Sequence, residues 1–279
     1  MSRNRRLELR GSTALVTGAS AGIGLAVARR LARKGANLVI AARRPDKLEK
    51  AAAQLRGIGV KVLAVPTDVG RHEDLERLVE TTLRDMGTID VLVNNAGIEA
   101  FCHFAELPPE RIEETIRVNL TSALMLTRLV VPHMLAARSG HVVNMSSTAG
   151  KLGPPFGAVY ATTKAGLIAF TQSLRSEYRN RGISASVICP GFADDGGIYD
   201  RMKADSGRHS PPFVGSTTAD RVARAVIRAI EKDRPEMIVN WPPLRPIAVL
   251  LQMFPSLGAS LVRVASVRFL KRVADSQRL

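Results

Sequence analysis

Short apolar runs rich in small and β-branched residues alternate with longer segments of helical periodicity along most of the chain. Ile23, Val27 and Leu31, for example, recur at the spacing of one helix face, and Gly35 follows as a helix-ending glycine. This pattern predicts strands at 12–17, 37–42, 60–65, 89–93, 140–145, 183–189 and 237–239. It predicts helices at 22–34, 46–56, 73–86, 109–137, 157–179 and 218–232.

Strands that alternate with helices through short connections indicate an α/β fold with a parallel sheet. The strands lack polar alternation, which is typical of strands covered by helices on both faces. We therefore predict a single doubly wound Rossmann-type domain at residues 10–241, with about seven parallel strands. Residues 242–279 follow as a helical C-terminal extension.

The chain has 279 residues, of which 46% are hydrophobic, and a formal net charge of +15. A basic protein suggests a nucleic acid or an anionic membrane as partner. However, residues 1–10 hold four arginines against one glutamate, and residues 242–279 hold six cations against one aspartate. These two ends carry +3 and +5, more than half of the charge, so we expect no nucleic-acid partner for the predicted domain.

Cys102 and Cys189 cannot form a disulfide framework, which indicates a reducing compartment. No cluster of histidine and cysteine has metal-ligand spacing, so no metal site is predicted. The basic N-terminus is not followed by an apolar signal-peptide core. We expect a cytoplasmic location.

A glycine-rich turn, residues 17–24, joins the first strand to the first helix. Glycines allow a tight turn and close approach of a pyrophosphate, which the helix N-terminus then attracts. The strand–turn–helix context makes this a dinucleotide site. Its predicted contacts are Gly18, Ser20, Ala21, Gly22, Ile23 and Gly24.

Arg43 and Arg44 follow the second strand, where NAD-binding proteins place an acid on the ribose. Guanidinium groups pair instead with a 2′-phosphate, which favours NADP(H) over NAD(H). The alternative is that both arginines only occupy a surface turn before Pro45.

Several polar residues fall near the expected carboxyl edge of the sheet. Tyr160 and Lys164 lie four residues apart and so share one helix face. Ser147 follows the fifth strand, Asn94–Gly97 ends the fourth, and Asn119 lies on the helix between them. Ligands bind at this edge in doubly wound folds, which makes these residues candidate catalytic groups.

In these sequence motifs, taken together, the chain resembles the short-chain dehydrogenase/reductase family. The matches, in family order, are the 17–24 turn, Asp68-Val69, Asn94–Gly97, Asn119, Ser147, the Tyr160/Lys164 pair and Pro190-Gly191. The resemblance spans about residues 10–240. It implies a Rossmann-type fold, NAD(P)(H)-dependent interconversion of alcohols and carbonyls, and a homodimer or homotetramer.

The resemblance also implies roles for individual residues. Tyr160 is the general acid/base, with its phenolate favoured by Lys164, which also holds the nicotinamide ribose. Ser147, with Ser146 as its rival, bonds the substrate oxygen, Asn119 anchors a relay water, and Asp68 accepts from the adenine amino group. Further cofactor contacts are Val69, Asn95, Ala96, Gly97, Pro190, Gly191 and Phe192.

Two positions depart from the family pattern. Asp195 stands where a threonine commonly bonds the nicotinamide carboxamide, and Ala21 stands where NADP users often carry a basic residue. The first departure supports an alternative function, that of a non-enzymatic NADP-binding regulator of the same fold.

Two loops, at 98–107 and 194–217, are expected to wall the substrate site. Their mixed apolar and aromatic content suits a lipid-like, steroid-like or aromatic carbonyl better than a sugar. We interpret His103 as a loop residue rather than a second acid/base. The candidate wall residues are Glu99, Phe101, His103, Phe104, Ile198, Tyr199, Met202 and Phe213.

The tail contains a charge-free stretch of 17 residues, 246–262, between Arg245 and Arg263. Because it is short and contains Gln252, Pro255 and Gly258, we do not expect a transmembrane helix. Three interpretations remain. The stretch packs on its own subunit or a partner, it covers the substrate site, or it lies on an anionic membrane surface as a peripheral contact.

Overall fold

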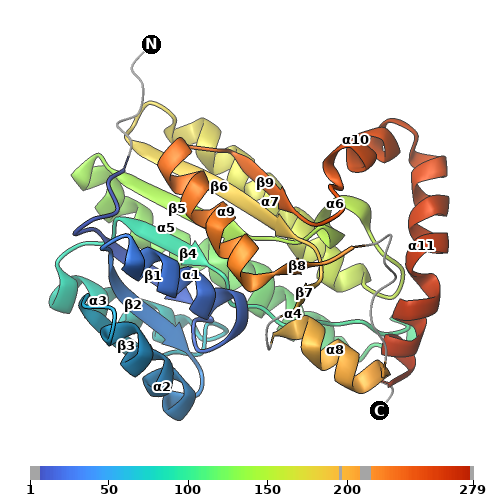
Figure 1. Ribbon diagram of the computed structural model, residues 1–279, viewed down its shortest axis with the longest axis horizontal. Coiled ribbons are helices and arrows are strands. Elements are labelled where there is room, and N and C mark those ends of the chain that lie inside the picture. Colours follow the sequence, from blue (N-terminus) through green and yellow to red (C-terminus); the bar gives the residue numbers. More distant parts are fainter. Residues whose placement is uncertain (1–6, 195–196, 208–214, 277–279) are drawn as a thin grey trace.

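The computed structural model describes residues 7–194, 197–207 and 215–276. Seven strands form one parallel sheet in the order β3-β2-β1-β4-β5-β6-β9 (Figure 1). The strands are β1 (Thr13–Thr17), β2 (Asn37–Ala42), β3 (Val62–Pro66), β4 (Val91–Asn94), β5 (Gly140–Met145), β6 (Ile183–Pro190) and β9 (Glu236–Val239). This confirms the predicted doubly wound sheet of about seven strands.

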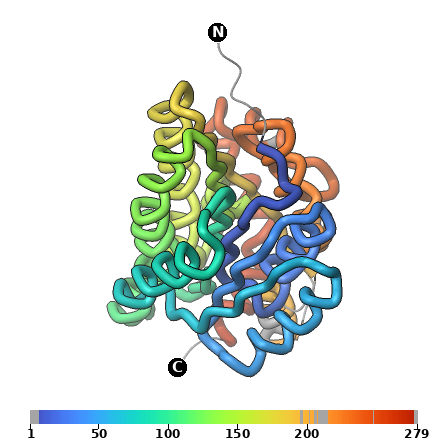
Figure 2. The backbone as a smooth tube through the Cα atoms, turned by 90° about the vertical axis from the view of Figure 1, so that its left-hand side faces the viewer, coloured from blue at the N-terminus to red at the C-terminus, as the bar shows by residue number. Residues whose placement is uncertain are grey.

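Helices cover both faces of the sheet, so that the sheet lies between two helical layers (Figure 2). One layer consists of α1 (Gly22–Arg33), α2 (Pro45–Arg56) and α9 (Ala219–Lys232). The other consists of α3 (His72–Met86), α5 (Ser122–Ala137) and α7 (Ala158–Tyr178). The predicted helices are confirmed, with boundaries that differ by a few residues.

The apolar strand residues fill a separate core on each face. Ala14 and Val16 of β1 pack in the core beneath α1 and α9, while Leu15 between them packs in the core beneath α3 and α5. Successive side chains of a strand point to opposite faces, and both faces are covered here. This double burial explains why the strands show no polar alternation.

The strand order reverses between β1 and β4, because the chain leaves β3 at the sheet edge and returns to the other side of β1. Such a reversal opens a crevice at the carboxyl ends of the two central strands. The crevice is where the glycine turn after β1 and the Asn94–Gly97 segment meet.

The predicted helix at 109–137 is continuous but not uniform. It begins as α4 (Pro109–Ile116), widens into a π-helical turn, η2 (Arg117–Thr121), and continues as α5. This segment is long and apolar enough to cross a membrane. Leu126, Val130 and Met134 are nevertheless buried in the core beneath α3, which accounts for its hydropathy.

Between β6 and α9 the sequence predicts only a loop, but the structure contains further elements there. They are a two-stranded sheet of β7 (Ala193–Asp194) and β8 (Thr217–Thr218), and the helix α8 (Ile198–Ser206). Short elements of this kind are also found at η1 (Phe104–Glu106) and α6 (Ala149–Leu152). They are too short to give a clear periodic signal.

The charge-free stretch of the tail is divided between two helices, α10 (Arg245–Met253) and α11 (Pro255–Ser276). The break lies at Phe254, because Pro255 lacks the N–H needed to continue α10 but suits the first turn of a new helix. Together α10 and α11 form a helical hairpin beside the carboxyl edge of the sheet (Figure 1). We call residues 245–276 the C-terminal hairpin.

Candidate active site

A cavity of about 1060 Å³ lies at the carboxyl edge of the sheet. Its walls come from the glycine turn, the ends of β2, β4, β5 and β6, helices α7 and α8, and the C-terminal hairpin. Every residue that the sequence predicts to contact the cofactor lines this cavity. Of the four predicted catalytic residues, Ser147, Tyr160 and Lys164 line it, whereas Asn119 does not.

The glycine turn folds tightly against the start of α1. Gly18 has a φ of +66°, a left-handed conformation that favours glycine. A Cβ atom at Gly24 would lie 2.3 Å from the carbonyl oxygen of Gly18, so no side chain fits there. The turn therefore brings bare backbone and the N-terminus of α1 to the cavity, as a pyrophosphate requires.

Thr17, which is not among the predicted site residues, joins the carboxyl ends of β1 and β4 through hydrogen bonds. Its Oγ1 accepts hydrogen bonds from the backbone N–H groups of Asn95 and Ala96, at 3.0 and 3.1 Å. The Asn95 side chain in turn donates to the Thr17 carbonyl at 2.9 Å. The signal in the sequence is a polar residue at the carboxyl end of a strand whose centre is apolar.

The cavity is also lined by Arg43, Arg44 and Asp68, which follow β2 and β3. Both arginines are exposed directly after β2. The backbone N–H of Asp68 donates to Asp74 Oδ2 at 2.8 Å, and this bond lowers the pKa of Asp74 below its usual range. Asp74 in the first turn of α3 thus holds the Asp68 loop, a positioning contact that the sequence did not reveal.

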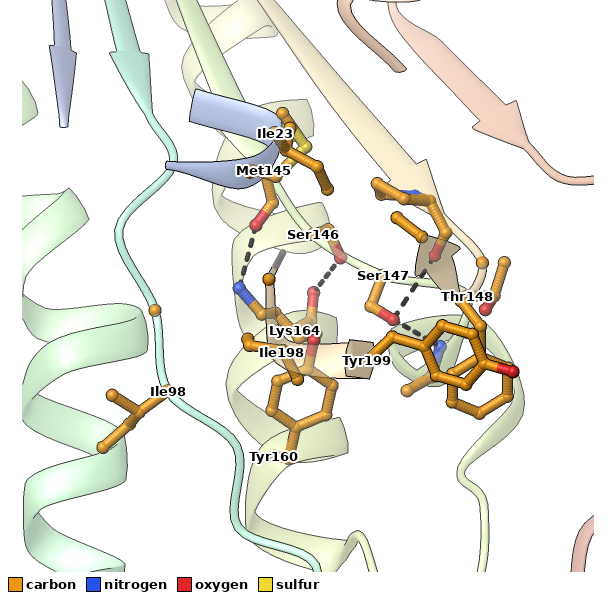
Figure 3. A pocket seen from close by; sticks show the side chains of 18 of the residues that line it. Ile23, Ile98, Met145, Ser146, Ser147, Thr148, Tyr160, Lys164, Ile198 and Tyr199 are labelled. Atoms are coloured by element: carbon orange, nitrogen blue, oxygen red, sulfur yellow. Dashed lines mark hydrogen bonds between the residues drawn. The ribbon is translucent and has the colours of Figure 1, made fainter. Parts of the chain in front are cut away.

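Lys164 lines the cavity but is buried, with 3% of its surface exposed. Its Nζ donates to the Met145 carbonyl at 3.0 Å and lies 5.6 Å from the centre of the Tyr160 ring (Figure 3). Burial lowers the pKa of Lys164 to about 8, with the nearby Cys189 opposing the shift. A lysine this deep loses its hydration, which is a cost to the folded state.

Tyr160 lies one helical turn before Lys164 on α7 and is buried against Phe101, with ring centroids 5.5 Å apart. Burial raises the pKa of its hydroxyl to about 12, while a hydrogen bond with Ser147 acts in the opposite direction. In the protein alone, burial therefore outweighs the phenolate stabilisation that we expected from Lys164. Tyr160 keeps its proton at neutral pH.

The two candidate serines have different surroundings. The Ser146 hydroxyl donates to the carbonyl of Lys164 at 2.7 Å and so supports α7. The Ser147 hydroxyl accepts from the backbone N–H of Ala149 at 3.1 Å and donates to the carbonyl of Pro190 at 3.5 Å (Figure 3), and it also lowers the pKa of the Tyr160 hydroxyl. This arrangement favours Ser147 over Ser146 as the serine next to the reacting oxygen.

Asn119 lies behind the cavity wall, in the π-helical turn. Its amide donates to the carbonyl of Ile98 at 2.9 Å, and its carbonyl accepts from the N–H of Ile98 at 2.7 Å. A π-turn widens the helix locally and is frequent at functional sites. Here it lets the Asn119 side chain bond both backbone groups of Ile98. A Cβ atom added at Gly97 would lie 3.2 Å from Asn119 Oδ1 and would also contact Lys164, so both side chains lie beside Gly97.

An apolar cluster packs around Tyr160. It joins α7, α8 and α11 through Phe101, Tyr160, Tyr199, Met202, Phe269, Leu270 and Val273. Phe192 stacks edge-on against Phe269 at 5.6 Å. The second half of α11 therefore packs against its own subunit next to Tyr160, and the hairpin forms one wall of the cavity.

The predicted substrate loops contribute only some of their candidates. Phe101, Ile198, Tyr199 and Met202 line the cavity, whereas Glu99, His103 and Phe104 are not among its lining residues. His103 Nε2 lies 3.0 Å from the Asp275 carboxylate of α11, so it fastens the loop to the hairpin. Phe104 is 65% exposed. Asp195 and Phe213 lie outside the described residues.

Comparisons with known proteins point to one family. Residues 12–204 match the family model for short chain dehydrogenases. The ketoacyl reductase HetN of Nostoc sp. is 39% identical over 236 residues, covering 85% of this chain and 81% of its own. The D-beta-hydroxybutyrate dehydrogenase of Cupriavidus necator is 36% identical over 243 residues, covering 87% and 91%.

Solved structures agree with this result. NAD⁺-bound xylitol dehydrogenase is similar with a TM-score of 0.77 and 28% identity, over 84% of this chain and 99% of its own. A metagenomic short-chain oxidoreductase in complex with NADP has a TM-score of 0.71 and 30% identity, over 84% and 98%.

The sheet topology and the glycine turn at its switch point define a dinucleotide-binding α/β protein. The matches in sequence and structure are to oxidoreductases. The chain belongs to the short-chain dehydrogenase family.

Proposed function

We propose that this protein interconverts an apolar carbonyl compound and the corresponding alcohol with NADP(H), using Tyr160 as the general acid/base. The observation that carries the proposal is the convergence of Tyr160, Lys164 and Ser147 in the same cavity as the glycine turn. The glycine turn is far from these three residues in the sequence, and their shared cavity supports a proton donor next to a nucleotide site.

The cavity fits a dinucleotide. The turn at Gly18 and Gly24 leaves no room for a side chain and exposes the N-terminus of α1, which suits a pyrophosphate. Asp68 lines the same cavity and would accept from the adenine amino group, and the nicotinamide half would be flanked by Asn95, Ala96, Gly97, Pro190, Gly191 and Phe192. When bound, NADPH supplies a hydride for the carbonyl carbon.

Arg43 and Arg44 support NADP(H) over NAD(H). Both guanidinium groups are exposed at the cavity edge after β2, where they would pair with a 2′-phosphate. Solved relatives include both an NAD⁺ and an NADP complex, so the preference of this chain rests on its own arginines.

Tyr160 acts as the proton donor when the carbonyl is reduced. Its raised pKa of about 12 means that the hydroxyl is protonated over the physiological range, which is the state a general acid requires. Ser147, whose hydroxyl is close enough to lower the pKa of Tyr160, holds the substrate oxygen as negative charge develops there.

Lys164 supplies positive charge near Tyr160, with its ammonium nitrogen 5.6 Å from the centre of the tyrosine ring. It also holds the nicotinamide ribose. Asn119 holds the backbone at Ile98 next to Lys164, and we propose that it anchors a water that relays protons to Lys164. The cation therefore assists the loss of the Tyr160 proton during reduction.

The walls around Tyr160 favour an apolar substrate. Phe101, Phe192, Tyr199 and Met202 surround the tyrosine, and Leu270 of α11 completes the wall. An acyl, steroid-like or aromatic carbonyl would bury its apolar surface there, whereas a sugar would lose hydrogen bonds to water. We further propose a cytoplasmic enzyme that forms a homodimer or homotetramer.

A panel of ketones and aldehydes assayed by NADPH absorbance tests this function. We expect turnover of apolar carbonyls with carbon chains or rings, and turnover at least tenfold slower for sugars of equal size. Tight NADPH binding without turnover of any compound would favour the regulatory alternative. Absence of NADPH binding would refute both.

A further inference from the structure

The C-terminal hairpin exposes several large apolar side chains to solvent. Val249, Leu250 and Met253 of α10 follow the helical i, i+1, i+4 spacing, and Phe254 lies at the corner between the helices. Leu257, Leu261 and Val264 continue this surface along α11. Met253 is 67% exposed and Val264 76%. Large apolar side chains that are exposed together mark an interaction site.

The same hairpin carries most of the positive charge of the described tail. Arg263, Arg268, Lys271 and Arg272 lie on α11, and Arg245 begins α10. Asp275 is the one acid of the described tail, and it faces His103. On the helical wheel of α11, Arg268, Lys271 and Arg272 continue the exposed stripe of Leu257, Leu261 and Val264. Apolar side chains next to cations on one exposed surface favour an anionic bilayer, because lipid phosphates pair with the cations and the acyl chains cover the apolar groups.

The apolar surface is continuous with the cavity. Leu261 and Val264 are exposed to solvent and also line the cavity next to Leu270. On the opposite face of α11, Phe269 and Val273 pack in the cluster that contains Tyr160. The hairpin thus has one face toward the reacting site and the other toward solvent (Figure 1).

We propose that the C-terminal hairpin docks the protein on an anionic lipid bilayer, with the cavity mouth at Leu261 and Val264 against the lipid. Val249, Leu250, Met253, Phe254 and Leu257 insert among the acyl chains, while Arg268, Lys271 and Arg272 pair with lipid phosphates. A lipophilic substrate reaches Tyr160 from the bilayer through this mouth. This last step rests on the proposed function, whereas the docking itself does not.

A second copy of the chain is the competing occupant, and the charge disfavours it. In a symmetric dimer the same surface lies on both sides of the interface, so the cations of two hairpins would share it with one acid from each, Asp275. Anionic lipid neutralises these cations instead, and it accommodates an irregular apolar surface without a complementary groove.

Vesicle flotation of the full-length protein, without cofactor or substrate, tests the docking. We expect the protein to float with phosphatidylcholine vesicles that contain about 30% phosphatidylglycerol, and to bind pure phosphatidylcholine at least tenfold more weakly. The variant Leu250→Ser/Met253→Ser/Phe254→Ser should bind the anionic vesicles at least tenfold more weakly than the parent. None of these three side chains lines the cavity.

Two matched controls separate a specific surface from general properties. Phe104→Ser/Ile116→Ser removes exposed apolar side chains elsewhere and should leave vesicle binding unchanged. Arg268→Glu/Lys271→Glu should weaken binding to anionic vesicles roughly tenfold or more, whereas Arg71→Glu/Arg84→Glu, with the same change in net charge, should not. Thermal melting of each variant confirms that it is folded.

Three results would overturn the proposal. The parent protein fails to bind anionic vesicles, or the triple-serine variant binds them as well as the parent. In the third, the triple-serine variant changes the mass of the oligomer while neither protein binds lipid, which would assign the surface to a second copy. Because flotation needs no turnover, a failure of docking is distinguishable from a failure of the proposed reductase activity.

Discussion

Lys164 is the residue whose replacement most directly separates stability from activity. Lys164→Met keeps the length and apolar stem of the side chain but removes the buried ammonium group. The lysine is 3% exposed, and its pKa is lowered to about 8 by burial. Because the unfolded chain binds this proton more tightly than the folded protein does, the charge destabilises the fold.

The size of this effect follows from the difference in pKa. A value of about 8 against the ordinary 10.5 corresponds to a cost of about 3 kcal/mol, fully present below pH 8. The cost declines as pH rises and is gone above the unfolded pKa of 10.5. Between pH 7 and pH 9.5 the native protein should regain about 2 kcal/mol relative to Lys164→Met.

Urea unfolding at pH 7 and pH 9.5, followed by circular dichroism, measures this difference. At pH 7 the Lys164→Met variant should gain stability relative to the parent protein, and this gain should shrink toward pH 9.5. The variant should show no turnover at either pH. Lys47→Met, at an exposed position on α2, is the matched control and should show no such pH dependence. An equal stability difference at both pH values would refute the claim that Lys164 is buried with its charge.

Three further predictions concern the cofactor and the hairpin. Arg43→Ala/Arg44→Ala should lower the ratio of kcat/KM for NADPH over NADH at least tenfold; an unchanged ratio would refute the phosphate assignment. Gly24→Ala should weaken NADPH binding in a fluorescence titration at least tenfold, because the methyl group meets the Gly18 carbonyl at 2.3 Å, and full affinity would contradict the close packing. Phe269→Ala should weaken the packing of the hairpin on the domain by about 3 kcal/mol and speed proteolysis of the hairpin roughly 100-fold, with the 10–241 domain intact. Unchanged cleavage would show that Phe269 does not hold the hairpin in place.

The fold was predictable because its signals are local and repeated. Uniformly apolar strands such as Leu38–Ala41 and amphipathic helices such as α1 have distinct periods, and their alternation leaves few possible topologies. The candidate site was predictable for a related reason. Parallel strands place their carboxyl ends on one edge, so residues after different strands meet there, as Asn95, Ser147 and Pro190 do.

What the sequence did not reveal depends on packing between distant elements. The π-turn at Asn119 leaves no mark in the hydrophobic pattern, since its geometry is fixed by bonds to Ile98. The raised pKa of Tyr160 follows from burial against Phe101 and the neighbouring cluster. The two apolar faces of α11 acquire different roles only when Phe269 docks beside Tyr160 and leaves Val264 exposed.

The central claim is that Tyr160 transfers the proton in carbonyl reduction, and Tyr160→Phe tests it most directly. The variant removes one oxygen atom and keeps the ring that packs on Phe101. With the best carbonyl of the panel and NADPH, we expect kcat to fall at least 100-fold while NADPH binding stays within about twofold. A variant that keeps full kcat would contradict the account.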